Sequence, residues 1–587
     1  MDAPSSTATD VAPEPSPDQP EPPSPTRSRL GRLDWRTAVG VAVVAAFVAL
    51  PLQALRKAGG SPMEEGFMLV FPERLLAGDV PHKDFLHLYG PGSLWALAAT
   101  YKVLGTSIGV ERAFGLLQQL GIIFGVFTIA LPWGRKVATV CGVMSVLITV
   151  TPIGLTALAW DGAVALGLWG LIVGLWARKA AASAADEPDG ARRAERLFLV
   201  AGLLGGGALL FRPDLLLAIG LGYAAVVWGQ DRAHVKRLAV ALVGLTAVGY
   251  LAQLAMAGPG NAIEGMFLEP VFKLRDGRTL PAPPSWDKFD GALAAVAQLD
   301  APGWSFPAFK GPQQVVLWFY LLPLAVLAEV VLSVLRVRER PESWRARVML
   351  AAALFGMGML PQAIQRPDTT HLSWVSCVPL ALFPLYVADL VQRRFATRGP
   401  RLLPSAVAAL TAVVILFGVM PHFTVRPWTE YTREVVKKDY SGNLVQHDGR
   451  AFYVQSKPIA PAVQGVVDEV GRRAEPGDRL LVGTADLRRT PYSDAYLYYL
   501  LPDLEPATRY IEMDPGIANA EDSGLAEEVA GADWLILSHV WDPWREPNTS
   551  ADLGSDEPNK VVEENFCLVD EYGDGPVPYF LLYQRCR

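Results

Sequence analysis

The sequence predicts a mainly α protein, with a polytopic membrane domain of about eleven transmembrane helices and a soluble C-terminal α/β domain. Three observations support this fold class. Long apolar runs recur through the first 420 residues and then stop. Hydrophobic residues make up 51% of the 587 residues and charged residues only 19%. Basic side chains collect between the apolar runs, as they do in the cytoplasmic loops of membrane proteins.

The N-terminal segment is polar and rich in proline. Residues 1–33 contain few large apolar side chains, so we expect a disordered segment. No cleavable signal peptide fits, because the first apolar run begins late. Arginines precede the first predicted span, Thr37–Leu55, and the positive-inside rule therefore predicts a cytoplasmic N-terminus.

The short apolar run Ser93–Leu104 sets the topology of the rest. At 1.5 Å per residue it cannot cross ~30 Å of hydrocarbon, so we expect a helix on the outer membrane surface. The later spans are then expected at about 108–132, 137–158, 162–177, 197–211, 213–230, 238–257, 314–335, 348–364, 373–391 and 402–420. Five basic loops face the cytoplasm in this arrangement, and the odd span count leaves the C-terminus outside.

These expectations divide the chain into a transmembrane domain at 34–421 and an extracytoplasmic domain at 422–587, with a first outer loop at 61–107. In the C-terminal domain, two helical patterns are each followed by a short buried strand, Arg479–Val482 and Trp534–Leu537. A hairpin closes the domain. Its flanking cysteines, Cys567 and Cys586, are predicted to form a disulfide in an oxidising compartment.

Several function classes find no support in the sequence. There is no basic aromatic module for nucleic acid, no phosphate-binding glycine loop, and no nucleophile–histidine spacing. Cys141 and Cys377 lie in apolar runs and are expected to be inert. His82 and His87, with Asp84 between them, could contact a divalent metal ion, so the metal requirement stays open.

Ionisable residues gather in the segments predicted to face outward. The first outer loop opens with Glu64-Glu65 and carries Asp84 further on. The other outer turns contribute Asp161, Arg212 beside Asp214, and the group Arg366, Asp368 and His371. Each could be a helix-end charge reaching water, but their convergence on one side predicts a polar cavity. Carboxylates and cations in such a cavity suit glycosyl transfer, because a carboxylate can accept a hydroxyl proton and cations can stabilise a departing phosphate.

The first outer loop also resembles that of a known family. Glu64-Glu65-Gly66, the stretch Gly78–Phe85 and Tyr89-Gly90-Pro91-Gly92 resemble the motifs of polyprenyl-phosphate-dependent glycosyltransferases of the GT-C superfamily, which includes protein O-mannosyltransferases and aminoarabinose transferases. The resemblance implies an inverting hexosyl- or pentosyltransferase that moves a sugar from a polyprenyl-phosphate carrier in the membrane to an acceptor of the cell envelope. It implies that Glu64 is the general base and Asp161 a second carboxylate.

One departure from the family pattern concerns the phosphate site. Tyr89 stands where the family has a lysine, so the phosphate-binding cation must come from elsewhere; the candidates are Lys83, His87, Arg212 and Arg366. Glu64 has a purely structural alternative, since Ser61-Pro62-Met63-Glu64 is also typical of a helix-capping box. For the whole chain, the alternative is a non-catalytic carrier or an inactive relative that binds lipid-linked sugar.

Overall fold

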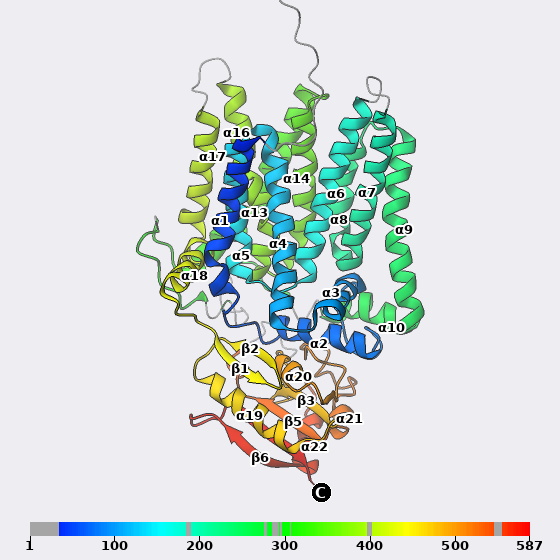
Figure 1. Cartoon of the computed structure of the whole chain (residues 1–587), viewed down its shortest axis with the longest axis vertical. Coiled ribbons are helices and arrows are strands. Elements are labelled where there is room, and N and C mark those ends of the chain that lie inside the picture. The colour runs from blue at the N-terminus through cyan, green and yellow to red at the C-terminus, as the bar shows by residue number, and fades with distance from the viewer. Residues whose placement is uncertain are drawn as a thin grey trace, which may run out of the picture.

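The computed structural model describes residues 34–183, 189–274, 279–283, 293, 296–305, 307–395, 402–544 and 554–586. The N-terminal segment 1–33, which we expect to be disordered, lies outside the described residues. The described chain forms a bundle of long helices with a smaller sheet domain at one end (Figure 1).

The bundle confirms the predicted membrane-spanning architecture. In the described residues, eight helices are long and apolar enough to cross a membrane, nine if the bent pair α15–α16 is one span, and two shorter apolar helices accompany them. The long helices are α1 (Trp35–Leu55), α4 (Ile108–Ala130), α5 (Arg135–Ile153), α6 (Ala159–Ala182), α7 (Gly190–Phe211), α9 (Arg232–Ala257), α13 (Gly311–Glu339) and α14 (Trp344–Gln365). The others are α8 (Leu216–Val227), α15 (Thr369–Ser376), α16 (Pro379–Arg394) and α17 (Leu403–Val413) with its continuation η4 (Val414–Val419).

Two short helices of the first loop lie between the bundle and the sheet domain (Figure 1). Helix α2 (Glu64–Ala77) ends at Gly78, whose φ of 111° is a left-handed conformation that favours glycine. Helix α3 (Pro91–Leu104) begins with proline in its first turn and has 14 residues, roughly 21 Å of helix. It is therefore too short to span, as its sequence predicts.

The segment between the spans predicted at 238–257 and 314–335, where the sequence predicts no span, contains helical structure. Helix α10 (Pro259–Ile263) runs into the π-helix η3 (Glu264–Lys273). Glu269 of η3 lies 3.9 Å from Arg509 of the C-terminal domain, so this segment also contacts that domain.

The C-terminal domain is the predicted α/β layer. Its five-stranded sheet has the order β4-β3-β5-β7-β6, in which β3 pairs in parallel with β5 and the β6–β7 hairpin is antiparallel. The strands are β3 (Arg479–Thr484), β4 (Glu505–Pro506), β5 (Trp534–Ser538), β6 (Phe566–Tyr572) and β7 (Phe580–Arg585). The helices are α18 (Val425–Lys437), which leads in from the bundle, α19 (Ile459–Arg473), α20 (Tyr496–Leu500), α21 (Leu525–Ala530) and α22 (Glu557–Asn565).

A second sheet, not expected from the sequence, joins this domain to the first loop. Strands β1 (Asn443–His447) and β2 (Arg450–Val454) form a hairpin around Asp448-Gly449. Both turn residues have positive φ, 44° and 75°, as a type I′ turn requires. The hairpin was recognisable in the sequence, because Asp-Gly between alternating apolar residues is a strong hairpin signal.

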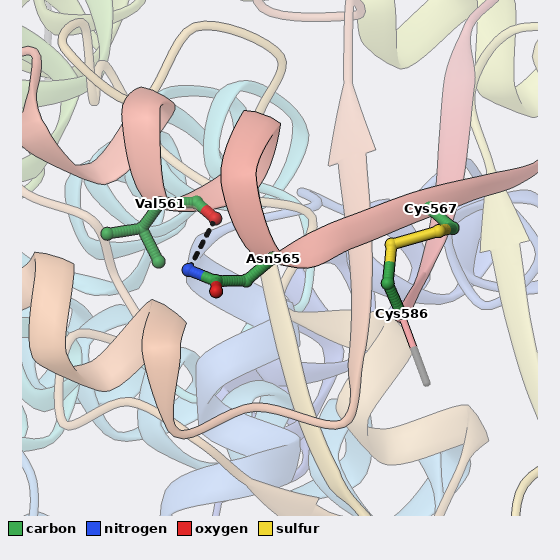
Figure 2. The surroundings of a disulfide bond; sticks show 4 residues. All are labelled: Val561, Asn565, Cys567 and Cys586. Atoms are coloured by element: carbon green, nitrogen blue, oxygen red, sulfur yellow. Dashed lines mark hydrogen bonds between the residues drawn. A yellow bond between two sulfur atoms is a disulfide. The ribbon is translucent and has the colours of Figure 1, made fainter.

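The C-terminal domain packs directly on α2. Phe452 of β2 and Tyr496 of α20 belong to the same buried cluster as Phe67 and Phe71 of α2. Arg450 forms an ion pair of 2.7 Å with Glu73 of α2. A disulfide joins Cys567 on β6 to Cys586 just after β7 and ties down the chain end, with Cα atoms 5.2 Å apart (Figure 2).

Candidate functional site

A small cavity lies where the first loop meets the bundle. We name it the first-loop cavity; its volume is about 10 Å³, roughly the space of one water molecule. Five segments enclose it: the start of α2, the loop before α3, the start of α6, the end of α7 and the end of α15. Its lining residues are Glu64, Phe67, Met68, Tyr89, Leu158, Ala159, Trp160, Arg212 and Trp374. It therefore combines one carboxylate and one guanidinium with an otherwise aromatic and apolar wall.

Glu64 supplies the carboxylate. It is the first residue of α2, after Met63 at the N-cap position, and its backbone N–H donates to Ser61 Oγ at 3.2 Å; this bond is the one that the predicted capping box would make, but Ser61 is not the N-cap. Asp161, in the first turn of α6, is fully buried and close enough to interact electrostatically with Glu64. Gln119 donates to Asp161 Oδ2 at 3.4 Å, whereas Oδ1 has no hydrogen-bond partner in the described part of the chain.

Arg212 supplies the cation. It is 7% exposed, and its Nε and Nη2 donate to the two oxygens of Asp214 at 2.9 and 2.7 Å. The guanidinium carbon lies 4.3 Å from the ring centre of Tyr89 and 5.3 Å from that of Trp160. Arginine and tyrosine are thus in contact at the position where the family motif has a lysine.

Trp374 lines the same cavity. Its backbone carbonyl accepts a hydrogen bond of 3.1 Å from Trp160 Nε1, which joins α15 to α6. Its own indole Nε1 is buried and makes no hydrogen bond within the described residues. A buried N–H group without a partner is costly, so a ligand oxygen at this point would be stabilised.

Glu65 is not brought into the cavity. It is 1% exposed and accepts from Arg112 Nε and Nη2 at 2.6 and 2.8 Å. The same guanidinium donates to the carbonyls of Leu55, Arg56 and Ala58 at the end of α1. Beside it, Glu111 accepts from the backbone N–H of Ala157 at 2.6 Å. This network, which we name the Arg112 hub, joins α1, α2, α4 and the α5–α6 connection.

The group Arg366, Asp368 and His371 forms a compact cluster at the start of α15. Arg366 Nε donates to Asp368 at 2.9 Å, and Asp368 also accepts from the backbone and ring nitrogens of His371 at 2.8 and 2.9 Å. Burial would raise the pKa of Asp368, but His371 and Arg366 outweigh burial and hold this pKa well below its usual range. His371 packs 4.5 Å from the ring of Trp374, so the cluster adjoins the first-loop cavity without lining it.

The remaining first-loop candidates lie outside the cavity. Asp84 accepts from the backbone N–H of Val80 at 2.8 Å and so closes a turn. Lys83 is half exposed and 3.6 Å from Asp84. His87 is fully buried between Phe71, His82 and Tyr89, and burial lowers its pKa well below the usual value. Burial thus disfavours a positive charge on His87, which is not among the residues that line the first-loop cavity.

The histidines show no metal site in the described residues, where no group of three His, Cys, Asp or Glu side chains converges. His82 Nδ1 faces Gln253 Nε2 at 3.1 Å, and its Nε2 faces the Tyr89 carbonyl at 3.2 Å. Burial lowers the pKa of His82 to about 4. Both ring nitrogens are thus committed to protein partners.

Sequence reasoning missed the Arg112 hub and the aromatic wall. The signal for the hub was Glu111-Arg112 inside a predicted span, since ionisable residues in such segments are rare and have defined roles. Trp160 and Trp374 gave no comparable signal, because aromatic residues are common in apolar helices.

Solved structures share this architecture. ArnT from Cupriavidus metallidurans in the apo state matches with a TM-score of 0.50 at 13% identity, over 94% of this chain and 98% of that one. The archaeal oligosaccharyltransferase AglB from Archaeoglobus fulgidus, in complex with an inhibitory peptide and a dolichol-phosphate, matches with a TM-score of 0.50 at 12% identity, over 94% of this chain and 74% of that one. No protein-family model and no curated relative matches the sequence.

The fold and the site define a class of protein: a multi-pass membrane protein with a carboxylate–guanidinium cavity beneath an α/β domain. More particularly, the chain has the GT-C fold that the first-loop motifs predict. At this level of identity the likeness establishes the fold alone.

Proposed function

We propose that this protein is an integral-membrane glycosyltransferase that moves a sugar from a polyprenyl-phosphate carrier to an acceptor outside the cytoplasm. The observation that carries the proposal is the pairing of Glu64 and Arg212 in one cavity of a GT-C fold. In support, AglB, which shares this fold, binds a dolichol-phosphate, a polyprenyl-type lipid phosphate. A cation for the phosphate and a base for the acceptor are the two charged groups that such a transfer needs.

The residues have defined roles in this reaction. Glu64 accepts the proton of the acceptor hydroxyl as its oxygen attacks the anomeric carbon. The bond from that carbon to the phosphate oxygen breaks, and the polyprenyl phosphate leaves with the bonding electrons. Arg212 stabilises its negative charge, and Trp374 Nε1 offers a further hydrogen bond. A single displacement of this kind inverts the anomeric centre.

Asp161 would assist by its charge. It is a fully buried carboxylate in the first turn of α6 that interacts electrostatically with Glu64. The Arg112 hub holds the first turn of α2, and with it the position of Glu64, against the ends of α1 and α4.

Measuring the release of polyprenyl phosphate distinguishes a transferase from a non-catalytic carrier. The full-length protein in lipid nanodiscs is incubated with a set of polyprenyl-phosphate hexoses and pentoses and a membrane extract as acceptor source, and released polyprenyl phosphate is measured. A transferase releases it in proportion to enzyme, and Arg212→Ala abolishes the release. Stoichiometric binding of a lipid-linked sugar without release would identify a carrier.

The sidedness of the site has its own test. The first loop and the C-terminal domain share one end of the bundle, and the basic loops predict that this end faces outward (Figure 1). A cysteine introduced near Asn548 could report the sidedness of the domain, but the residues around it lie outside the described ones. Glu521 is exposed on the surface of the C-terminal domain, so Glu521→Cys is the better probe. A membrane-impermeant thiol reagent should label it in intact cells. Labelling only after lysis would reverse the topology.

A further inference from the structure

The first loop is held at two places by different parts of the molecule. The part that carries Glu64 lies against the C-terminal domain, and the part that carries Tyr89 lies against α7 of the bundle. In both places a glycine allows two segments to come closer than a residue with a side chain would permit. The two charged groups of the first-loop cavity, Glu64 and Arg212, therefore depend on different supports.

On the bundle side, Gly90 and Gly92 lie against the last residues of α7. A Cβ atom on Gly90 would be 2.9 Å from the carbonyl carbon of Leu210, and one on Gly92 would be 2.9 Å from Leu210 Cβ. Both distances are shorter than van der Waals contact. Leu210 is two residues before Arg212. The contact thus brings Tyr89, the neighbour of Gly90, to the guanidinium from the bundle side.

On the C-terminal side, Gly66 of α2 lies against the start of α20. This glycine is buried, and a Cβ atom on it would be 2.6 Å from the backbone nitrogen of Tyr496 and 3.2 Å from Ala495 Cβ. A side chain at this position would have to move α2 and α20 apart by roughly 1 Å to restore van der Waals contact. Because Gly66 is two residues after Glu64, such a movement would also displace the carboxylate.

Two further contacts hold this part of the chain on the C-terminal domain. The backbone N–H of Gly60, just before α2, donates to the Tyr453 carbonyl of β2 at 2.7 Å. Near the other end of α2, Glu73 forms its ion pair of 2.7 Å with Arg450. The domain therefore holds the chain both before and after Glu64.

The Arg112 hub holds the same turn of α2 from the bundle, through Glu65. An attachment through one side chain lets a helix pivot about it, whereas the backbone contact at Gly66 fixes the turn at a second point. A catalytic group must be held within about 0.5 Å of its working position. The hub and the C-terminal domain together give Glu64 such a position relative to Arg212.

From these contacts we propose that the C-terminal domain positions Glu64 for catalysis, and that Gly66 is the positioning residue through which it does so. The inference rests on the proposed transferase function and gives the domain a part in it. A displacement of about 1 Å can cost on the order of 10²-fold in rate. Donor binding at Arg212 is supported from the bundle and should not change.

The test compares Gly66→Ala with Gly109→Ala in nanodiscs, with the polyprenyl-phosphate hexose or pentose that the wild-type protein turns over fastest. Gly109 is exposed in the first turn of α4, and a Cβ atom on it would be 3.8 Å from Ser107 Oγ, an ordinary van der Waals distance. Gly66→Ala should lower kcat about 10²-fold and change the donor KM by no more than about twofold. Hydrogen exchange in peptides from α2 and α20 should become faster. Gly109→Ala should match the wild type in all three measurements.

A rescue variant separates positioning from general loss of stability. Ala495→Gly, added to Gly66→Ala, removes one of the opposing atoms, so part of the lost kcat should return. Glycine by itself loosens the start of α20, so a protein that is only destabilised would lose further activity instead. If Gly66→Ala does not fold, Arg450→Gln is the milder variant. It removes the ion pair with Glu73 and should lower kcat with the donor KM unchanged.

Two results would overturn the inference. One is wild-type kcat in Gly66→Ala together with faster hydrogen exchange, because the domain would then move without effect on Glu64. The other is a donor KM that rises as much as kcat falls, since Arg212 would then depend on the same contact. A wild-type protein that releases no polyprenyl phosphate contradicts the transferase function itself, so the two failures are distinguishable.

Discussion

Glu64 and Glu65 are adjacent in the sequence but belong to two different regions of the molecule. Glu64 lines the first-loop cavity together with Arg212. Glu65 is enclosed in the Arg112 hub, where the arginine satisfies both of its oxygens. Successive residues of a helix point about 100° apart, so the first turn of α2 sends one carboxylate to each region. An acidic pair in a loop motif can thus divide into one group for chemistry and one for architecture.

Substitution of Glu64 should give the largest effect of all, a loss of catalytic turnover. We expect Glu64→Gln to lower the turnover number on the order of 10²–10⁴-fold, because the amide cannot accept a proton. Its stability should stay close to that of the wild type, since glutamine also serves in a capping box. The rate of polyprenyl-phosphate release and the thermal midpoint in detergent measure the two effects. Near-normal turnover would return Glu64 to a capping role.

At Glu65 we expect the opposite pattern, a large loss of folding stability and a small loss of turnover. Removing Arg112, as in Arg112→Gln, leaves a buried carboxylate without its partner and should cost about 3–5 kcal/mol of folding stability. Glu65→Gln, which keeps one acceptor oxygen for Arg112, should cost less. Turnover per folded molecule should fall far less than in Glu64→Gln. The comparison breaks if Glu65→Gln is stable and inactive, because the base would then be Glu65.

The sequence predicted the architecture better than the site. Apolar runs and basic loops led to the spans, because burial in lipid imposes long uniform patterns. Glu64, Asp161 and Arg212 were found from motif and position, and all three meet at or beside one cavity. That Glu65 turns away could not be predicted, since it depends on Arg112, which is distant in sequence and lies within a span. Contacts of this kind are set by packing between helices.

A smaller effect distinguishes the two candidate phosphate arginines. Both arginines form an ion pair with an aspartate, Arg212 with Asp214 and Arg366 with Asp368, but of the two only Arg212 lines the first-loop cavity. Arg212→Lys should raise the KM for the lipid-linked donor about tenfold, because lysine cannot supply the paired donors of a guanidinium. Arg366→Lys should change this KM by no more than about twofold, a difference below one ordinary hydrogen bond. Equal losses in both variants would place Arg366 at the phosphate as well.

The smallest effect is expected at Asp84, the second acidic position of the first loop. Its carboxylate accepts the Val80 N–H at 2.8 Å and closes the turn after α2. Asp84→Asn retains an acceptor oxygen, so stability should change by less than about 1 kcal/mol and turnover by less than about twofold.

Asp84→Ala separates the turn from any chemistry. It leaves the Val80 N–H without its acceptor and should cost about 1–2 kcal/mol of stability, while turnover per folded molecule stays unchanged. A catalytic carboxylate would show the opposite pattern, in which Asn and Ala are equally inactive and equally stable. That outcome would move the base from Glu64 to Asp84. The difference between Glu64 in the first-loop cavity and Glu65 in the Arg112 hub would then no longer explain which carboxylate is catalytic.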